Sequence, residues 1–280
     1  MIIGFLGKGG SGKSSLSTQM ALFLHSNTKN VMAIDADHNM DLSYNLTGGN
    51  ISKINYFGQS LKDIEKSVGL TEAERYADAF VANVSKRFTL DPVSEEIEQY
   101  STVLANGVRL MTAGEQTDRV LYGQACSHVL TTPLKILLPL LELQESDVVV
   151  VDEKAGADGV STGIVTGIDV GVIVCEPALH SIKTAQQIAE LMAFYETPYM
   201  FVGNKIRSNE DKDFITTALG EEPVAFVTET TTIKRTPSLL VTEWSDELQA
   251  IADASEQRNQ NDRLLRTMRK FKRNKEFSLQ

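Results

Sequence analysis

A glycine-rich stretch near the N-terminus constrains the fold more than any other feature of this sequence. Residues 7–12 (Gly-Lys-Gly-Gly-Ser-Gly) separate a short apolar run at residues 2–6 from residues 13–25, where apolar side chains recur with the spacing of an amphipathic helix. A second apolar run follows at residues 31–34. Strand, turn, helix and strand within about 35 residues make a βαβ unit, which predicts a parallel sheet.

The same alternation returns in the second half of the chain. Residues 181–195 have helical periodicity, and short apolar runs typical of strands buried on both faces lie at residues 148–151, 170–175, 199–202 and 224–227. We expect residues 51–110 to be mostly helical. Residues 245–277 are expected to form a polar helix that is broken near residues 259–261. The predicted class is α/β, with a mostly parallel central sheet and helices on both faces.

The glycine-rich stretch also has the composition of a phosphate site. Gly7 to Ser14 match the P-loop pattern Gly-x-x-x-x-Gly-Lys-Ser, between a strand and a helix as that pattern requires. Glycines let backbone N–H groups approach phosphate oxygens, and the helix N-terminus adds unpaired N–H groups. Lys13 is expected to reach the β- and γ-phosphates, and the Ser14 hydroxyl to bind Mg²⁺. The predicted nucleotide-binding residues of this P-loop NTPase fold are Gly9, Gly10, Ser11, Gly12, Lys13, Ser14 and Ser15.

Carboxylates follow two predicted strands, at the edge where open α/β sheets bind their ligands. Asp152 ends the run at residues 148–151, which is the position of the Walker B carboxylate that holds Mg²⁺. Asp35 and Asp37 follow the run at residues 31–34. A capped turn is the alternative interpretation of residues 35–39, because Asp and Asn favour such turns in any protein.

A second lysine, Lys8, stands near the start of the loop. With it, residues 8–15 closely resemble the deviant Walker A motif of the superfamily that contains MinD/ParA ATPases, the nitrogenase iron protein and arsenite-pump ATPases. The resemblance implies an ATP hydrolase that forms a homodimer with ATP sandwiched between the subunits. It also implies that Lys8 reaches the phosphates of the partner and acts in catalysis together with Lys13.

The resemblance extends to the segments after the predicted strands. Residues 35–39 are similar to switch I, which implies that Asp37 orients the attacking water and approaches Mg²⁺. Residues 152–156 are similar to switch II, which implies that the backbone N–H of Gly156 meets the γ-phosphate. Asn204 is similar to the family's adenine-binding Asn. His38 departs from the usual residue of switch I, where the family has Pro.

Further segments resemble the CooC-type ATPases, which help to insert nickel into carbon monoxide dehydrogenase. These segments are residues 88–92, 107–114, 152–156, 175–177 and 181–185. The resemblance implies an ATPase for metallocentre assembly that acts on a client protein. In that branch a Cys-x-Cys motif binds metal across the dimer, and here Cys126 and His128 occupy the corresponding stretch, a ligand set that suits Zn²⁺ or Ni²⁺. A packing cysteine and a surface histidine are the alternative.

Charge divides the chain into two unequal parts. The net charge is −10, but residues 263–280 hold seven basic residues and one acidic residue, a charge of +6, which leaves −16 on the other 262 residues. We therefore predict an ATPase domain at residues 1–244, followed by a C-terminal helix with a basic amphipathic tail at residues 245–280. The acidic body argues against nonspecific nucleic-acid binding by the body itself.

The basic tail has the composition of a helix that contacts an anionic membrane or nucleic acid. A helix docked on the acidic body and a disordered tail are the alternatives. The rival function is therefore that of a MinD/ParA-type positioning or partitioning ATPase, which binds a membrane or nucleoid surface. Two cysteines, no signal-peptide pattern and no apolar run of membrane-spanning length favour a cytoplasmic protein, with peripheral membrane association under the rival function.

Overall fold

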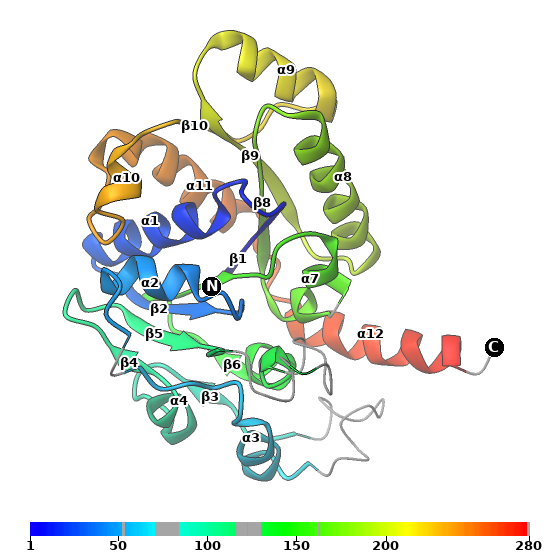
Figure 1. The fold of residues 1–280 in the computed structure, drawn as a ribbon. Coiled ribbons are helices and arrows are strands. Elements are labelled where there is room, and N and C mark those ends of the chain that lie inside the picture. Colours follow the sequence, from blue (N-terminus) through cyan, green and yellow to red (C-terminus); the bar gives the residue numbers. More distant parts are fainter. Residues whose placement is uncertain (52–53, 71–83, 116–121, 123–129, 162, 279–280) are drawn as a thin grey trace.

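An eight-stranded sheet forms the centre of the computed structural model, which describes residues 1–51, 54–70, 84–115, 122, 130–161 and 163–278. The strand order is β10-β9-β8-β1-β7-β2-β5-β4 (Figure 1). All neighbours pair in parallel except β4 and β5. The strands are β1 (Ile2–Gly7), β2 (Asn30–Asp35), β4 (Thr102–Val103), β5 (Arg109–Thr112), β7 (Asp147–Asp152), β8 (Val170–Cys175), β9 (Tyr199–Ile206) and β10 (Ala225–Thr228).

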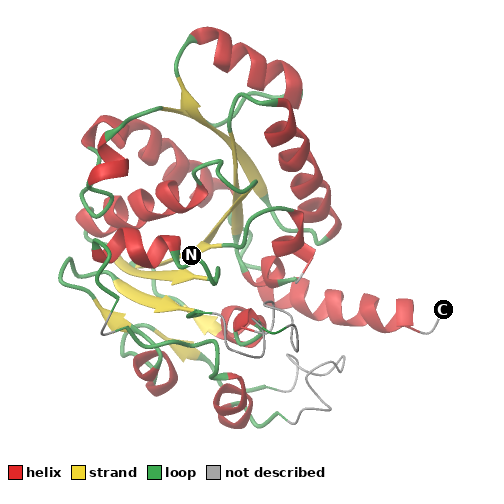
Figure 2. Cartoon of the chain, in the orientation of Figure 1, coloured by secondary structure: helices red, strands yellow, loops and turns green. Residues whose placement is uncertain are grey.

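Helices cover both faces of this sheet (Figure 2). The α-helices are α1 (Lys13–Ser26), α2 (Asp41–Thr47), α3 (Leu61–Ser67), α4 (Glu95–Gln99), α6 (Leu134–Leu137), α7 (Ala157–Ser161), α8 (Leu179–Phe194), α9 (Asn209–Leu219), α10 (Thr232–Arg235), α11 (Ser245–Arg258) and α12 (Arg263–Ser278). Short 3₁₀ helices are η3 (Leu138–Leu140), η4 (Ile164–Gly167) and η5 (Thr242–Trp244). A separate parallel pair joins β3 (Phe88–Thr89) to β6 (Leu141–Glu142).

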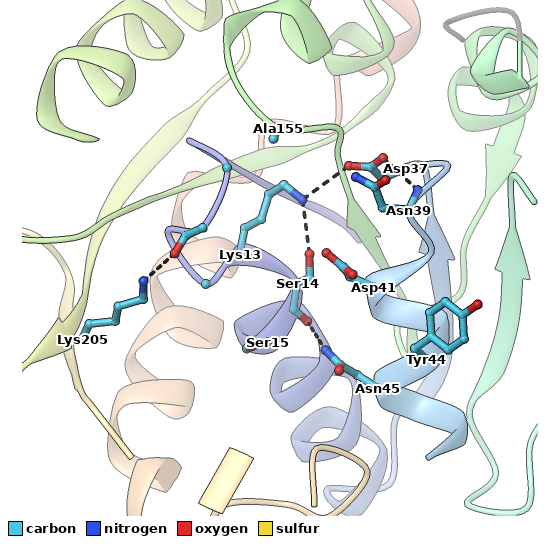
Figure 3. A pocket seen from close by; sticks show the side chains of 13 residues that line it. Lys13, Ser14, Ser15, Asp37, Asn39, Asp41, Tyr44, Asn45, Ala155 and Lys205 are labelled. Atoms are coloured by element: carbon cyan, nitrogen blue, oxygen red, sulfur yellow. Dashed lines mark hydrogen bonds and ion pairs between the residues drawn. The ribbon is translucent and has the colours of Figure 1, made fainter. Parts of the chain in front are cut away.

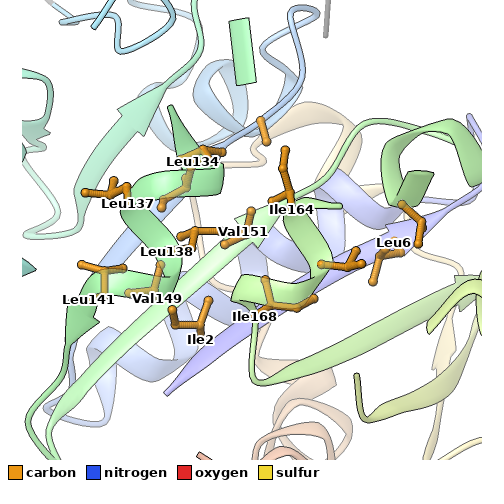
Figure 4. Close-up of a cluster of buried hydrophobic side chains, with 14 of the residues drawn as sticks. Ile2, Leu6, Leu134, Leu137, Leu138, Leu141, Val149, Val151, Ile164 and Ile168 are labelled. Atoms are coloured by element: carbon orange, nitrogen blue, oxygen red, sulfur yellow. The ribbon is translucent and has the colours of Figure 1, made fainter. Parts of the chain in front are cut away.

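The hydrophobic core is split by the sheet into two layers. Successive strand residues point to opposite faces, so Ile2 packs in one layer and Ile3 in the other. The first layer joins the strands to α6, η3, η4 and α8, and Figure 4 shows side chains from α6, η3 and η4 around Val149 and Val151. The second layer joins the strands to α1 and α11. Burial on both faces explains why the central strands read as continuous apolar runs.

The structure confirms the predicted α/β class, since each apolar run is a strand of a mostly parallel sheet. The prediction of mostly helix at residues 51–110 was wrong. Its described part contains the short helices α3 and α4 together with β3, β4 and the start of β5. The reason lies in tertiary contacts, because residues 109–112 form β5 by pairing with β2. The local sequence of β5 does not predict this pairing.

The C-terminal segment is broken where the sequence indicates, between α11 and α12. The first half of α12 docks on the body. Arg263 pairs with Asp169 at 3.0 Å, Arg266 is buried and donates to the Ile168 carbonyl, and the Thr267 hydroxyl lies 3.1 Å from that of Thr166. Among the residues that the structure describes, none of the helices combines the length and the apolar character needed to cross a bilayer.

Candidate nucleotide-binding site

The loop between β1 and α1 closes tightly at the C-terminal edge of the sheet. Gly12 has a φ of +92° and precedes α1, and a Cβ there would lie 2.2 Å from Asn204 Nδ2. A Cβ on Gly7 would lie 2.5 Å from the Val174 carbonyl oxygen. Both positions therefore require glycine. A turn in which the Ser11 N–H donates to the Lys8 carbonyl at 3.0 Å shapes the loop between them.

A pocket of about 480 Å³ opens over this loop. Figure 3 shows it from close by, with side chains from α1, switch I and α2 converging on one space. The lining residues are Gly9, Gly10, Gly12, Lys13, Ser14, Ser15, Asp37, Asn39, Asp41, Tyr44, Asn45, Ala155 and Lys205. The predicted phosphate-binding residues, with the exception of Ser11, thus share one pocket with the predicted switch I carboxylate Asp37.

Lys13 is the buried cation of the pocket. Its Nζ lies 3.5 Å from Asp152 Oδ1, 4.0 Å from Asp37 Oδ2 and 3.2 Å from the Ser14 hydroxyl. Burial by itself would lower the pKa of Lys13, but the charges of Asp152 and Asp37 outweigh it and the pKa is raised. Lys13 therefore stays charged, as binding of a phosphate requires.

Asp35 holds switch I in place through hydrogen bonds to its carboxylate. Its Oδ2 accepts hydrogen bonds of 2.8 Å from both the N–H and the hydroxyl of Ser43, and its Oδ1 accepts one of 3.3 Å from the Asp37 N–H. Burial and then the charge of Asp152 raise the pKa of Asp35 to about 7. Asp37 in turn accepts from the Asn39 N–H at 3.1 Å, which fixes its carboxylate at the pocket wall.

Asp152 is fully buried, and its Oδ1 lies 3.5 Å from the Lys13 ammonium. Burial raises its pKa, against the attraction of Lys13. A buried carboxylate of this kind is costly unless a cation binds it. Oxygen donors suit Mg²⁺, so Asp152, Asp37 and the Ser14 hydroxyl fit that ion. Within the described ranges, no group of three His, Cys, Asp or Glu side chains is placed to hold a metal.

The other predicted residues fall in different places. Lys8 Nζ donates to the Gly9 carbonyl at 3.3 Å and does not line the pocket. The Gly156 N–H donates to the Gly7 carbonyl at 2.9 Å, which ties switch II to the loop. Asn204 Nδ2 donates to the Ser11 carbonyl at 2.9 Å. The predicted metal ligands Cys126 and His128 lie outside the described residues.

Sequence reasoning missed a group of residues on α2. Asp41 and Tyr44 line the pocket, and Asn45 Nδ2 lies 3.3 Å from the Thr18 hydroxyl and 3.5 Å from the Ser14 carbonyl, which joins α2 to α1. Their place in the sequence could have indicated them, because α2 begins directly after switch I.

Sequence comparison assigns the chain to a family. It matches the CobQ/CobB/MinD/ParA nucleotide binding domain over residues 2–273. The chain belongs to this family. It therefore contains an ATP-binding domain of the MinD/ParA type.

Individual relatives agree with this family. The chain is 28% identical over 229 residues to the uncharacterized ATP-binding protein MJ0084 of Methanocaldococcus jannaschii, covering 81% of this chain and 87% of the relative. It is also 28% identical over 216 residues to the carbon monoxide dehydrogenase accessory protein CooC of Rhodospirillum rubrum, covering 77% of this chain and 78% of CooC. The fold is similar to that of the septum site-determining protein MinD of Pyrococcus horikoshii OT3, complexed with Mg-ADP, with a TM-score of 0.58, 15% identity and coverage of 91% and 94%. The predicted resemblance to MinD/ParA and CooC-type proteins is confirmed.

Proposed function

We propose that this MinD/ParA-family chain is a Mg²⁺-dependent ATPase whose ATP-driven dimerisation times the capture or release of a client protein. The observation that carries the proposal is the position of Lys13. Its ammonium lies between Asp152 and Asp37, beside the Ser14 hydroxyl, at the N-terminus of α1. Phosphoryl transfer needs this combination of a phosphate-binding cation, an Mg²⁺ site and a carboxylate near the attacking water.

Each residue has a distinct part in the proposed hydrolysis. Lys13 and the N–H groups of the loop bind the phosphates and stabilise the charge that develops on the transferred group. Ser14 and Asp152 hold Mg²⁺, which supplies further charge neutralisation when bound. Asp37, whose carboxylate lies 4.0 Å from the Lys13 ammonium, orients the water for in-line attack. The Gly156 N–H donates to the Gly7 carbonyl in this structure. In the proposed mechanism it binds the γ-phosphate instead, so that loss of this phosphate on hydrolysis moves switch II.

Lys8 has a role between subunits in this proposal. Its ammonium contacts only the Gly9 carbonyl among the hydrogen bonds of the described chain, and it stays outside its own pocket. A second copy that covers the pocket would receive this cation at its phosphates, by the same physics as an arginine finger. ATP binding then closes the homodimer and hydrolysis opens it.

The client that we propose is a metalloenzyme during assembly of its metal centre. The similarity to CooC over 77% of this chain supports this choice. Cys126 and His128 would supply two thiolates and two imidazoles per dimer, a set that suits Zn²⁺ or Ni²⁺. The rival proposal, a positioning ATPase that binds an anionic surface, is favoured by the +6 charge of residues 263–280.

Metal analysis combined with measurement of molecular mass tests the proposed function. The purified protein is analysed for bound Zn²⁺ and Ni²⁺ with and without a nonhydrolysable ATP analogue. Assembly of a metal centre predicts a dimer with the analogue, stoichiometric metal, and loss of that metal in Cys126→Ala. Cys175→Ala is the matched control, since Cys175 is a buried core residue. A metal-free protein that binds anionic liposomes with ATP, and loses this binding on truncation at Asp262, would support the rival.

A further inference from the structure

Two consecutive carbonyl groups of the phosphate loop are held by side chains from the end of β9. Asn204 Nδ2 donates to the Ser11 carbonyl at 2.9 Å, and Lys205 Nζ donates to the Gly10 carbonyl. These contacts join segments 193 and 195 residues apart in the sequence. Figure 3 shows Lys205 reaching the loop from the side opposite Asp37. β9 therefore holds the loop through Asn204, which does not line the pocket, and through Lys205, which lies at the pocket wall opposite Asp37.

Glu176 completes this arrangement from the end of β8. Its Oε2 lies 2.6 Å from Lys205 Nζ, and its backbone N–H donates to the Ser181 hydroxyl at 3.1 Å, at the start of α8. Lys205 has a φ of +58°, a left-handed conformation that residues with side chains rarely adopt. Its N–H donates to Asn204 Oδ1 at 2.8 Å, which stabilises this conformation. We call Glu176, Asn204 and Lys205 the loop brace.

The geometry of the peptide bond says what the brace does to the loop. In a trans peptide the C=O and the following N–H point in opposite directions. Since Asn204 holds the Ser11 carbonyl toward β9, the Gly12 N–H points away from β9, and Gly12 lines the pocket. The Lys205 bond to the Gly10 carbonyl fixes the adjacent peptide, whose Ser11 N–H closes the turn with Lys8.

We propose that the loop brace positions the phosphate-binding loop, so that Glu176, acting through Lys205, is a positioning residue for the phosphate chain of ATP. This inference rests on the proposed function and names residues that hold the loop in its binding conformation. A loop held in advance loses less conformational freedom on binding. The brace therefore improves affinity for the phosphates themselves, whichever base they carry.

The direction in which Glu176→Ala changes the Kd distinguishes the loop brace from a purely electrostatic effect. Glu176→Ala removes a negative charge near the pocket, so electrostatics alone predicts tighter binding of an anion. The brace predicts weaker binding, because Lys205 loses the carboxylate that orients it. We expect Glu176→Ala to raise the Kd of Mg-ATP by about threefold to tenfold, which corresponds to the net contribution of one ordinary hydrogen bond, because Glu176 acts on the phosphates only through Lys205. Glu190→Ala, an exposed position on α8, is the matched control and should leave the Kd unchanged.

The experiment is calorimetric titration with three probes: Mg-ATP, Mg-ADP and magnesium tripolyphosphate. The brace predicts that Glu176→Ala weakens all three by the same factor and that Lys205→Met weakens them by about tenfold. Glu176→Ala should add nothing further in the Lys205→Met background, because it acts through Lys205. Lys205→Arg keeps a donor and should fall between Lys205→Met and the unchanged protein.

Three outcomes would overturn the brace. The first is that Glu176→Ala binds the probes more tightly than the unchanged protein. The second is that Glu176→Ala has its full effect on the Kd in the Lys205→Met background as well. The third is that the substitutions weaken binding of the nucleotides but leave the Kd of tripolyphosphate unchanged. The last result would make these side chains contacts of the base or ribose. Failure of the proposed function looks different, because the unchanged protein would then either bind none of the three probes or bind Mg-ATP without hydrolysis and ATP-driven dimerisation. Thermal unfolding of each variant shows whether it folds, and Glu176→Ala keeps the test available if Lys205→Met does not.

Discussion

At the scale of single residues, the site holds more buried carboxylates than cations to pair with them. Asp35 and Asp152 are both fully buried, and the charge of Asp152 contributes to the raised pKa of Asp35. Only Lys13 offsets these charges at short range in the described structure. Such crowding of carboxylates is costly by itself and becomes favourable once a divalent cation binds.

This crowding leads to a first prediction, for Asp152→Asn. Removing one buried charge should raise the stability of the protein without nucleotide by roughly 1–2 kcal/mol, which corresponds to a Tm increase of several degrees. The same change should lower Mg²⁺-dependent ATP hydrolysis by roughly a hundredfold, because a ligand of the ion is lost. Thermal unfolding and a phosphate-release assay measure the two effects. A variant that is less stable than the unchanged protein without Mg²⁺ would contradict the argument.

Glu153 gives a second prediction, about pH. Its side chain is buried with an Oε1 that accepts no hydrogen bond, and burial, followed by the charge of Asp152, raises its pKa from 4.5 to about 8. Between pH 4.5 and 8 the folded state therefore binds more protons at Glu153 than the unfolded state, so this residue makes stability fall as pH rises. Glu153→Gln should remove that fall. Thermal unfolding from pH 5 to 9 measures it.

The expected sign for Glu153→Gln is specific. The Tm of the variant should exceed that of the unchanged protein by a few degrees at pH 8.5, with a much smaller difference at pH 5. Because Asp152 and Glu153 interact, the difference between the two curves reports the titration of Glu153 together with its effect on Asp152. Two parallel curves would show that Glu153 is ionised in the folded protein.

At the scale of secondary-structure elements, the sequence predicts those strands and loops whose conformation depends on neighbouring residues in the chain. The strands of the central sheet appear as apolar runs because both faces are buried, and Gly12 announces the loop because its φ needs glycine. β5 and the loop brace have no such signal. β5 depends on pairing with β2, and Glu176 lies 29 residues from Lys205 in the chain. Their function depends on distances that only the fold sets.

The docking of α12 gives a third prediction. Lys270 is buried on this helix, its Nζ lies 5.7 Å from the centre of the Tyr195 ring, and a Cβ on Gly163 would lie 1.4 Å from it. Burial, together with the charge of Lys135, lowers its pKa from 10.5 to about 7. The folded state binds fewer protons than the unfolded state between pH 7 and 10.5, so stability from this group rises with pH across that window.

Lys270→Met should therefore stabilise the docked helix at pH 7 and reduce the gain in Tm between pH 7 and 10. Hydrogen exchange of residues 263–278 should slow in the variant at pH 7, because the buried apolar stem is kept and the charge is lost. Arg269→Met is the matched control, since Arg269 is exposed on the same helix. Faster exchange in Lys270→Met than in Arg269→Met would contradict this account of the docking.

At the scale of the whole molecule, Lys8 gives the fourth prediction. Lys8 is the only residue of the predicted catalytic group that stays outside the described pocket of its own subunit. Lys8→Ala should therefore keep the Kd for ATP within about twofold while losing ATP-dependent dimerisation and turnover, since the role that we propose for this cation is across the dimer interface. Sedimentation with a nonhydrolysable analogue, together with ATP hydrolysis at increasing protein concentration, measures both. Lys183→Ala, an exposed position on α8, is the control.

A mixture of two inactive variants tests the direction in which Lys8 acts. A Lys8→Ala subunit keeps its own pocket but offers no cation to its partner, whereas a Lys13→Ala subunit loses its phosphate-binding lysine but keeps Lys8. If Lys8 acts across the dimer, a mixed dimer has one complete site, formed by the pocket of the first variant and the cation of the second. Turnover should then reappear on mixing and rise with the concentration of Lys13→Ala protein. Action within one subunit leaves every site in the mixture incomplete, so a mixture that is silent at every ratio, although the two variants form dimers, would assign Lys8 to its own pocket.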